Sequence, residues 1–388
     1  MSDATSRDQT ALADPKAVPV DPPRSERLST VEPPSEPLDA APPALESLPA
    51  ELSAEQRREL YRLLVTVRHL DLSAIAWQRQ GLIPGYAPCR GQEAAQIGSA
   101  FAMQPQRDFA FPTYRELGVA RAWGVDMVDY MATHKATGHG GLYNPARSRF
   151  APIQAVVAGS ALHAVGWAHG QRLDQPEPGP EGYGVAISYF GDGASSQGDV
   201  HEAMNFAGVF GSPVIFFVQN NGWAISVPTE QQVAGGSVAA RGAGYGFPSL
   251  LIDGDDVEAV VAATRTARAH AASGAGPVLI EAMTYRRGPH STSDDPGRYR
   301  SLDEERREGG VDPVDRYAQK LLSEGLVDQE FLEQAQRDAE AEENRVRTGV
   351  AALGPRPGAE MFDFVFADPP SSLTEQAASW RTEHDDYA

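Results

Sequence analysis

The first apolar repeat of the chain begins after residue 52. Its members follow the i, i+3, i+4 spacing of one helix face: Leu60, Leu63, Leu64, Val67 and Leu70. Ser53 and Gln56 form a capping-box pair at the start of this repeat, and Gly81 marks its end. The pattern predicts a long amphipathic helix at the beginning of the folded part.

Short runs in the middle of the chain have apolar residues on both faces of a strand. They are residues 182–190, 212–221, 247–254 and 276–285. Helix patterns precede or separate them, at residues 156–173, 195–211 and 255–274. Strands that are buried on both faces and alternate with helices predict an α/β fold with a doubly wound parallel sheet.

The two ends of the chain differ from this core. Residues 1–48 are rich in Pro, Ser and acidic residues. They predict a disordered tail, because such a composition buries too little apolar surface to offset the entropy of ordering. From about residue 312 the pattern is helical and charged. We therefore predict an α/β domain over 49–370, with helical N- and C-terminal appendages, and a second tail over 371–388.

Composition narrows the classes of partner and compartment. The net charge of −20 argues against nucleic acid and anionic membranes as partners, because phosphate contacts need clustered Lys and Arg. A single cysteine, Cys89, excludes an internal disulfide and fits a reducing compartment. No apolar run reaches the roughly 20 residues of a membrane-spanning helix, and the N-terminus has no signal-peptide pattern. The expected location is the cytoplasm.

Polar residues follow two consecutive predicted strands. Asp192 stands between Gly191 and Gly193, and Asn220 and Asn221 end the next strand. The carboxyl ends of such strands share one edge of a parallel sheet, where ligands bind. Carboxylate and amide oxygens suit Mg²⁺, and the glycines allow a phosphate to approach the backbone. Both motifs are also turn formers, and a lone Gly-Asp-Gly would be a turn; their pairing on consecutive strands favours a metal site.

Longer sequence motifs of the chain resemble those of a known family. "GDGASSQGDVHEAMNFAGVF", "QNNGWAISVPTEQQ", "ARGAGYG" and "EAMTYRRGPHSTSDDPGRYRS" resemble the alpha subunit of two-subunit 2-oxo acid dehydrogenases, the decarboxylating first component of their complexes. The resemblance runs from about residue 55 to residue 370. It implies the thiamine-diphosphate-binding fold, with thiamine diphosphate and Mg²⁺ as cofactors. These motifs favour the branched-chain type of the family, which acts on 3-methyl-2-oxobutanoate. The pyruvate type is the alternative.

The resemblance assigns the metal and diphosphate contacts. It implies that Asp192, Asn221 and the backbone carbonyl of Trp223 bind Mg²⁺. The residues against the diphosphate are then Gly191, Gly193, Ala194, Tyr114 and Arg115. The chain departs from the family at Gln219, where relatives often have Arg or Glu, and at Thr113, where branched-chain relatives often have Gln.

The resemblance also assigns the rest of the cofactor. Ser160 and Leu162 match residues that contact the aminopyrimidine ring. His290 matches a catalytic histidine that lies over the thiazolium and assists acyl transfer to lipoyl, while His139 is a further candidate for the cofactor neighbourhood. No potassium site is predicted, because residues 163–165 lack the ligands that some relatives have there. Ser291, which aligns with a phosphorylated serine of animal relatives, is interpreted as structural or substrate-lining.

The expected protein partners follow from a catalytic acid that this chain does not offer. No isolated Glu is placed to activate the aminopyrimidine, and in the family that residue belongs to the beta subunit. The resemblance thus implies an alpha2beta2 heterotetramer, inactive without its beta subunit, a lipoyl-bearing dihydrolipoyl acyltransferase, and a small 2-oxo acid substrate.

A stand-alone decarboxylase would need a second α/β domain, for which the chain has no room. A non-catalytic α/β binding module would not need Asp192 and Asn221 together. A nicotinamide dehydrogenase is disfavoured, since no G-x-G-x-x-G follows a strand.

Overall fold

The computed structural model describes residues 45–47, 49–136, 141–363 and 365–384. The predicted disordered tail over 1–48 lies almost wholly outside the described residues, as does His139. Along the described chain the helices are α1 (Ala54–Arg79), α2 (Glu93–Ala102), α3 (Leu117–Trp123), α4 (Met127–Lys135), α5 (Pro145–Ser148), α6 (Gly159–Asp174), α7 (Gly198–Phe210), α8 (Arg241–Gly244), α9 (Val257–Ala272), α10 (Leu302–Gly309), α11 (Pro313–Ser323), α12 (Gln329–Ala352) and α13 (Ser371–Glu383). Short 3-10 turns are η1 (Ala194–Ser196), η2 (Thr229–Gln231), η3 (Pro296–Arg298) and η4 (Gly358–Phe362).

A five-stranded parallel sheet forms the centre, in the order β1-β2-β3-β7-β6. Its strands are β1 (Phe109–Phe111), β2 (Ala186–Gly191), β3 (Val214–Asn220), β6 (Ser249–Asp253) and β7 (Val278–Met283). A separate two-stranded ribbon pairs β4 (Trp223–Ala224) with β5 (Val227–Pro228). Every residue of β3 is buried, as expected for a central strand covered on both faces. The predicted fold class is therefore confirmed.

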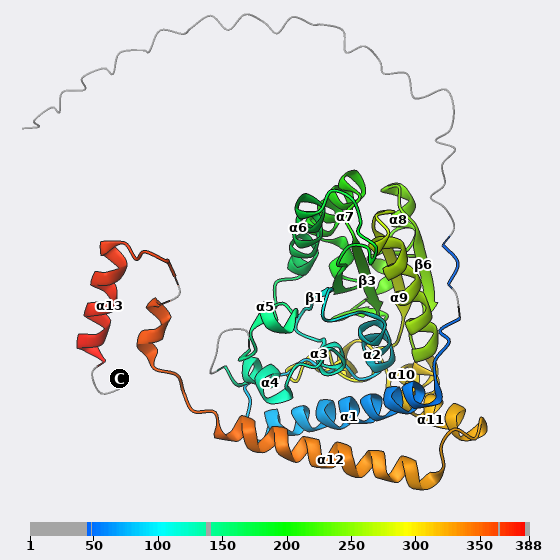
Figure 1. Ribbon diagram of the computed structural model, residues 1–388. Helices are drawn as coiled ribbons and strands as arrows, with labels where there is room; N and C mark the ends of the chain where they lie inside the picture. Colours follow the sequence, from blue (N-terminus) through cyan, green and yellow to red (C-terminus); the bar gives the residue numbers. More distant parts are fainter. Residues whose placement is uncertain (1–44, 48, 137–140, 364, 385–388) are drawn as a thin grey trace, which may run out of the picture. The chain divides into compact units, whose positions relative to one another are not determined.

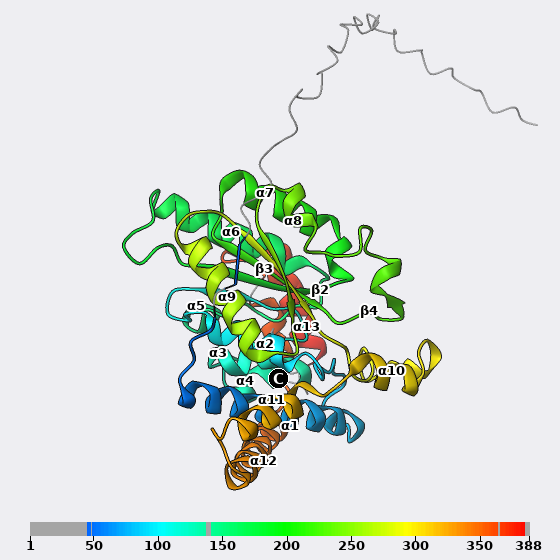
Figure 2. The same ribbon diagram turned by 90° about the vertical axis from the view of Figure 1, so that its right-hand side faces the viewer.

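Helices cover both faces of this sheet (Figures 1 and 2). On one face, Phe190, Phe216 and Val218 share a core with α6 and α7. On the other face, Ile215 and Phe217 share a larger core with helices that include α1, α2 and α9. The alternation along β3 divides neighbouring residues between the two cores, so both faces of the strand are apolar. This arrangement leaves the carboxyl edge of the strands for polar residues.

After residue 312 the chain contains α11, α12, η4 and α13, with loops between them. Helix α12 lies beside α1 (Figure 1), where the rings of Tyr61 and Phe331 are 6.1 Å apart. The segment predicted as a tail contains α13, a helix that its weak pattern did not predict, and Trp380 packs on Phe362 of η4 at 6.2 Å. The boundary at residue 370 stays a prediction. Within the described ranges, no helix has the length and apolar character needed to cross a bilayer.

Candidate active site

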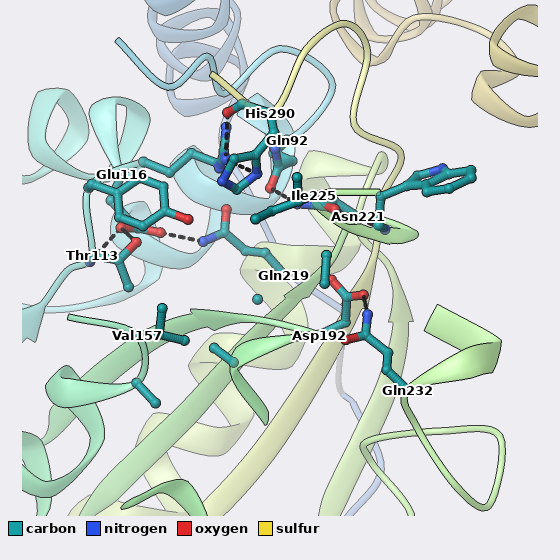
Figure 3. A pocket seen from close by; sticks show the side chains of 18 of the residues that line it. Gln92, Thr113, Glu116, Val157, Asp192, Gln219, Asn221, Ile225, Gln232 and His290 are labelled. Carbon is teal, nitrogen blue, oxygen red and sulfur yellow. Dashed lines mark hydrogen bonds between the residues drawn. The ribbon is translucent and has the colours of Figure 1, made fainter. Parts of the chain in front are cut away.

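A cavity of about 300 Å³ lies at the carboxyl edge of the sheet. Its walls come from the segments that follow β1, β2, β3 and β7, with the start of α2 (Figure 3). The register aligns Gly191 of β2 with Gln219 of β3, so the polar residues after both strands start from the same level. The lining includes most of the predicted site residues: Tyr114, Arg115, Gly191, Asp192, Gly193, Ala194, Asn221, Trp223 and His290.

Asp192 is buried and held by two donors. Thr229 Oγ1 and Gln232 Nε2 each lie 2.6 Å from its Oδ2 atom. Burial raises the pKa of this carboxyl above its usual range, and the hydrogen bond from Thr229 opposes that rise. A buried carboxylate without a cationic side chain bonded to it is suited to a metal cation, which compensates its charge.

The two asparagines at the end of β3 have different surroundings. Asn220 does not line the cavity; its Nδ2 donates to Glu281 Oε1 at 2.8 Å, and its Oδ1 lies 3.2 Å from the amide of Gly222 and 3.0 Å from Thr229 Oγ1. Asn221 lines the cavity; its Nδ2 donates to Gln92 Oε1 at 3.1 Å and its Oδ1 accepts from the amide of Trp223 at 3.2 Å. Asn221, not Asn220, therefore lines the cavity together with Asp192.

Gln92 carries an unused donor at this point. Its Nε2 has no hydrogen-bond partner among the described residues, although the side chain is fully buried and lines the cavity. A buried amide hydrogen without an acceptor is costly, so the position fits a ligand that brings acceptor oxygens. The donor set of Asp192, Asn221 and a backbone carbonyl, all oxygen atoms, likewise fits Mg²⁺.

A side chain at Gly193 would collide with neighbouring atoms. A Cβ atom at this position would come within 2.5 Å of the Ala224 Cβ and 3.1 Å of Gln232 Oε1. Gly191 differs, since a Cβ there would meet nothing closer than 3.9 Å. Of these two positions, only Gly193 has neighbours too close to accept a side chain. It lies where the backbone enters η1 beside the cavity.

Arg286 fixes the loop that carries the third predicted metal ligand. This fully buried guanidinium donates to the carbonyl of Trp223 at 3.4 Å and to that of Ile225 at 2.8 Å. It also donates to the Tyr299 hydroxyl at 2.7 Å, and that hydroxyl donates to Asp294 Oδ2 at 2.5 Å. Burial lowers the pKa of Arg286 to about 10, so the side chain stays charged at neutral pH.

His290 and Arg115 contact each other in the cavity wall. Arg115 donates to the carbonyl of Pro88 and, through Nη2, to the carbonyl of His290 at 2.9 Å. The same Nη2 atom lies 3.1 Å from His290 Nδ1. Burial and the nearby guanidinium groups lower the pKa of His290 to about 4, so its ring is neutral at pH 7. Because Arg115 can only donate, we assign the ring proton to Nε2.

The residues assigned to the aminopyrimidine lie elsewhere. Ser160 is fully buried, and its Oγ donates to the carbonyl of Tyr189 in β2 at 3.0 Å. Leu162 packs against the core around α6 and α7. Neither residue lines the cavity, so the structure does not bring them to the other site residues, and their assigned role stays a prediction. Ser291 is partly exposed in the loop after β7, where its hydroxyl lies 3.1 Å from that of Ser293.

Several cavity residues were not predicted from the sequence: Gln92, Glu116, Gln232 and, in contact with the wall, Thr229 and Arg286. The two glutamines of the α2 region offered a signal. Gln92 and Gln96 are one helical turn apart in a segment that, apart from Glu93, is small and apolar, which places polar groups on a buried face. Thr229 begins η2, and Gln232 and Arg286 lie in loops; nothing in the local sequence pattern marks any of the three.

The fold and this cavity fit the α/β dehydrogenase subunit that the sequence predicts, and comparison with known proteins supports that class. A family model described as dehydrogenase E1 component matches residues 61–347. The chain belongs to this family, and the resemblance to 2-oxo acid dehydrogenase alpha subunits is confirmed.

Individual relatives cover most of the chain. It is 42% identical over 346 residues (89% of this chain, 92% of the relative) to 3-methyl-2-oxobutanoate dehydrogenase subunit alpha of Mycobacterium tuberculosis. It is 38% identical over 331 residues (84% and 86%) to the pyruvate dehydrogenase E1 component subunit alpha of Bacillus cereus. The corresponding pyruvate dehydrogenase subunit of Staphylococcus aureus is 35% identical over 340 residues (85% and 88%).

Proposed function

We propose that this chain is the alpha subunit of a 2-oxo acid dehydrogenase that decarboxylates 3-methyl-2-oxobutanoate and transfers the acyl group to lipoyl on an acyltransferase. The observation that carries the proposal is the meeting of Asp192, Asn221 and the Trp223 loop in one cavity wall. The 42% identity to the mycobacterial branched-chain subunit supports the substrate class. Pyruvate is the second candidate, because pyruvate dehydrogenase subunits are similar over nearly the same length.

The cofactors proposed are thiamine diphosphate and Mg²⁺. Asp192, Asn221 and the carbonyl of Trp223 would hold the metal. Gly193 and Ala194 would lie against the diphosphate, which Arg115 would meet as a cation and Gln92 as a neutral donor. Thiamine diphosphate, when bound, supplies the electron sink that decarboxylation of a 2-oxo acid requires.

His290 is proposed to handle a proton of the acyl-transfer step. With the ring neutral and Nδ1 facing Arg115, the Nε2–H group is the donor available to a substrate oxygen. A neutral donor suits an oxygen that gains negative charge only during the reaction, since it adds no cation to the ground state. Asp294 supports this placement, because its carboxylate accepts from the amide of His290 at 2.7 Å.

A beta subunit is proposed to complete the site. Of the described residues that line the cavity, the carboxylates are Asp192 and Glu116, and side-chain donors already occupy both. Neither is free to activate a cofactor, which supports an activating acid on another chain and the alpha2beta2 assembly.

The cytoplasm is proposed as the location, because Cys89 is a free, buried thiol and fits a reducing compartment.

The test is to coproduce the chain with a candidate beta subunit and to measure steady-state kinetics on 3-methyl-2-oxobutanoate and pyruvate. We expect activity only when both chains and Mg²⁺–thiamine diphosphate are present. The specificity constant for the branched substrate should be at least about 10-fold higher, as one or two methyl groups in an apolar pocket allow. A preference for pyruvate would replace the branched-chain assignment. Unchanged cofactor binding in Asp192→Ala would favour a non-catalytic binding module.

A further inference from the structure

We propose that Gln219 is a positioning residue that holds the turn 113–116 against the end of β3. The proposal rests on the proposed function only in that Tyr114 and Arg115 of this turn are the diphosphate contacts expected from the family resemblance. Gln219 is a buried neutral amide at the end of β3, so the residues around it must satisfy both its donor and its acceptor. The contacts of that amide show how this is done.

The first contact joins Gln219 to the carboxylate of Glu116. Gln219 Nε2 donates to Glu116 Oε1 at 2.7 Å (Figure 3). The other carboxylate oxygen, Oε2, accepts from the amide and the hydroxyl of Thr113, both at 2.6 Å. Glu116 thus closes the turn on one side and reaches β3 on the other. All three hydrogen bonds require an acceptor at both oxygens of residue 116.

The second contact joins Gln219 to α2. Gln219 Oε1 accepts from Gln96 Nε2 at 2.9 Å, and the second hydrogen of the same Nε2 group reaches the carbonyl of Arg115 at 3.1 Å. Gln96 Oε1 accepts from the amide of Gly118 at 2.9 Å. The turn is therefore bound at both ends by side chains that Gln219 holds in place.

The order of donors and acceptors in this buried network is fixed. Glu116, Gln96 and Gln219 are all buried, so a mismatched donor or acceptor in this network is costly. Gln219→Glu sets two carboxylates against each other. Glu116→Gln gives an amide that must face another donor, whichever of the three amides is flipped. The exchange of both residues restores every bond, because an amide at position 116 can accept from Thr113 and donate to a carboxylate at position 219, which in turn accepts from Gln96.

This reciprocal exchange is the test. Gln219→Glu, Glu116→Gln and the double variant are compared with the wild-type full chain by thermal unfolding and by hydrogen exchange of the amides of residues 113–118, without cofactor. We expect Gln219→Glu to lower Tm by roughly 5–10 °C and Glu116→Gln by roughly 2–6 °C, with faster exchange of the Thr113 and Gly118 amides. The double variant should return Tm to within about 3 °C of wild type and restore slow exchange. Exchange in α9 serves as the internal control.

The consequence for the site is measured with the alpha–beta pair. The Kd for thiamine diphosphate at saturating Mg²⁺ should rise about 10-fold or more in each single variant and recover in the double variant. Additive losses in the double variant would overturn the network. Recovery of Tm with equal cofactor affinity in all four proteins would reduce Gln219 to a stabilising residue and overturn its positioning role. A wild-type pair that binds no thiamine diphosphate would instead overturn the proposed function, and the exchange data would still decide whether Gln219 orders the turn.

Discussion

The cavity has two regions of opposite character. Its polar floor consists of Asp192, Asn221 and Gln92, which are 1%, 6% and 0% exposed. Its apolar rim consists of Val156, Val157 and Ile225, which are 65%, 47% and 54% exposed. Charge and amide groups are thus buried, and aliphatic groups lie in solvent, the reverse of the usual distribution.

The difference separates two tasks. The floor residues start from strand ends and a helix start, and hydrogen bonds fix them before any ligand arrives, which is the arrangement expected of a preorganised head-group site. The rim residues belong to loops, and Ile225 has a φ of 56°, a left-handed conformation that a β-branched side chain rarely adopts. Arg286 holds it there by a hydrogen bond to its carbonyl. The floor is therefore the region suited to the diphosphate of the proposed cofactor, and the exposed rim is the region that the proposed beta subunit would cover.

The largest expected effect is on the floor. Asp192→Asn keeps the shape of the side chain but removes the charge that would hold Mg²⁺, while Thr229 and Gln232 lose a carboxylate partner. Affinity of the alpha–beta pair for thiamine diphosphate at fixed Mg²⁺ should fall roughly 100-fold or more, measured by calorimetry. Asp253→Asn is the matched control, since this carboxylate ends β6 on the same edge but is exposed and paired with Arg316. An equal loss in both variants would mean that the effect is general electrostatics, not ligation.

A smaller effect is expected where the floor meets the backbone. Gly193→Ala places a methyl group 2.5 Å from the Ala224 Cβ, so the β4 ribbon must move away from the cavity. We expect a loss of about 1–3 kcal/mol in the free energy of unfolding and weaker cofactor binding. Gly166→Ala, in the middle of α6 with open space at its Cβ, should instead stabilise the chain by about 0.5–1 kcal/mol. Urea unfolding of both variants measures the contrast, and an unaffected Gly193→Ala would show that the ribbon yields freely.

The rim should respond in the opposite way. Val156→Ser with Val157→Ser removes exposed apolar surface, so the free energy of unfolding of the chain alone should change by less than about 0.5 kcal/mol. Association with the beta subunit should weaken about 5- to 50-fold, because each buried aliphatic group contributes about 1 kcal/mol or more at an interface. Analytical ultracentrifugation of the mixed chains measures the change. Unaltered association would remove the assignment of the rim to a subunit contact.

The two regions also differ in how far the sequence predicts them. Asp192 and Asn221 follow long buried strands, so their local pattern alone places them on one edge. Gln92, Gln232 and Arg286 reach the site from separate segments, and only the packing of α2 and the loops brings them there. The three-residue strand β1 is too short to carry a pattern, although it positions the turn with Tyr114 and Arg115. A sequence pattern therefore predicts what a strand end presents, but not which distant side chains complete its hydrogen bonds.

The smallest expected effect concerns His290, which lines the cavity beside Arg115. Burial contributes most to the lowering of its pKa to about 4, followed by the charges of Arg115 and Arg286. Arg115→Gln should therefore raise the pKa of His290 part of the way towards its ordinary value of about 6.5, since burial remains. Histidine-selective NMR titration measures it, with His290→Asn to assign the resonance.

The sign of the pH dependence follows from this direction. The folded chain binds the His290 proton less readily than the unfolded chain, so the contribution of His290 to stability is complete above about pH 6.5 and is lost as the pH falls towards about 4. The difference in unfolding free energy between wild type and His290→Asn should thus be constant above about pH 7 and shrink below about pH 6. In Arg115→Gln that change should begin at the same pH and end at a higher one. A wild-type resonance that titrates near the ordinary value of about 6.5 would mean that His290 is open to solvent like the rim, and that the dry wall beside Arg115 does not form.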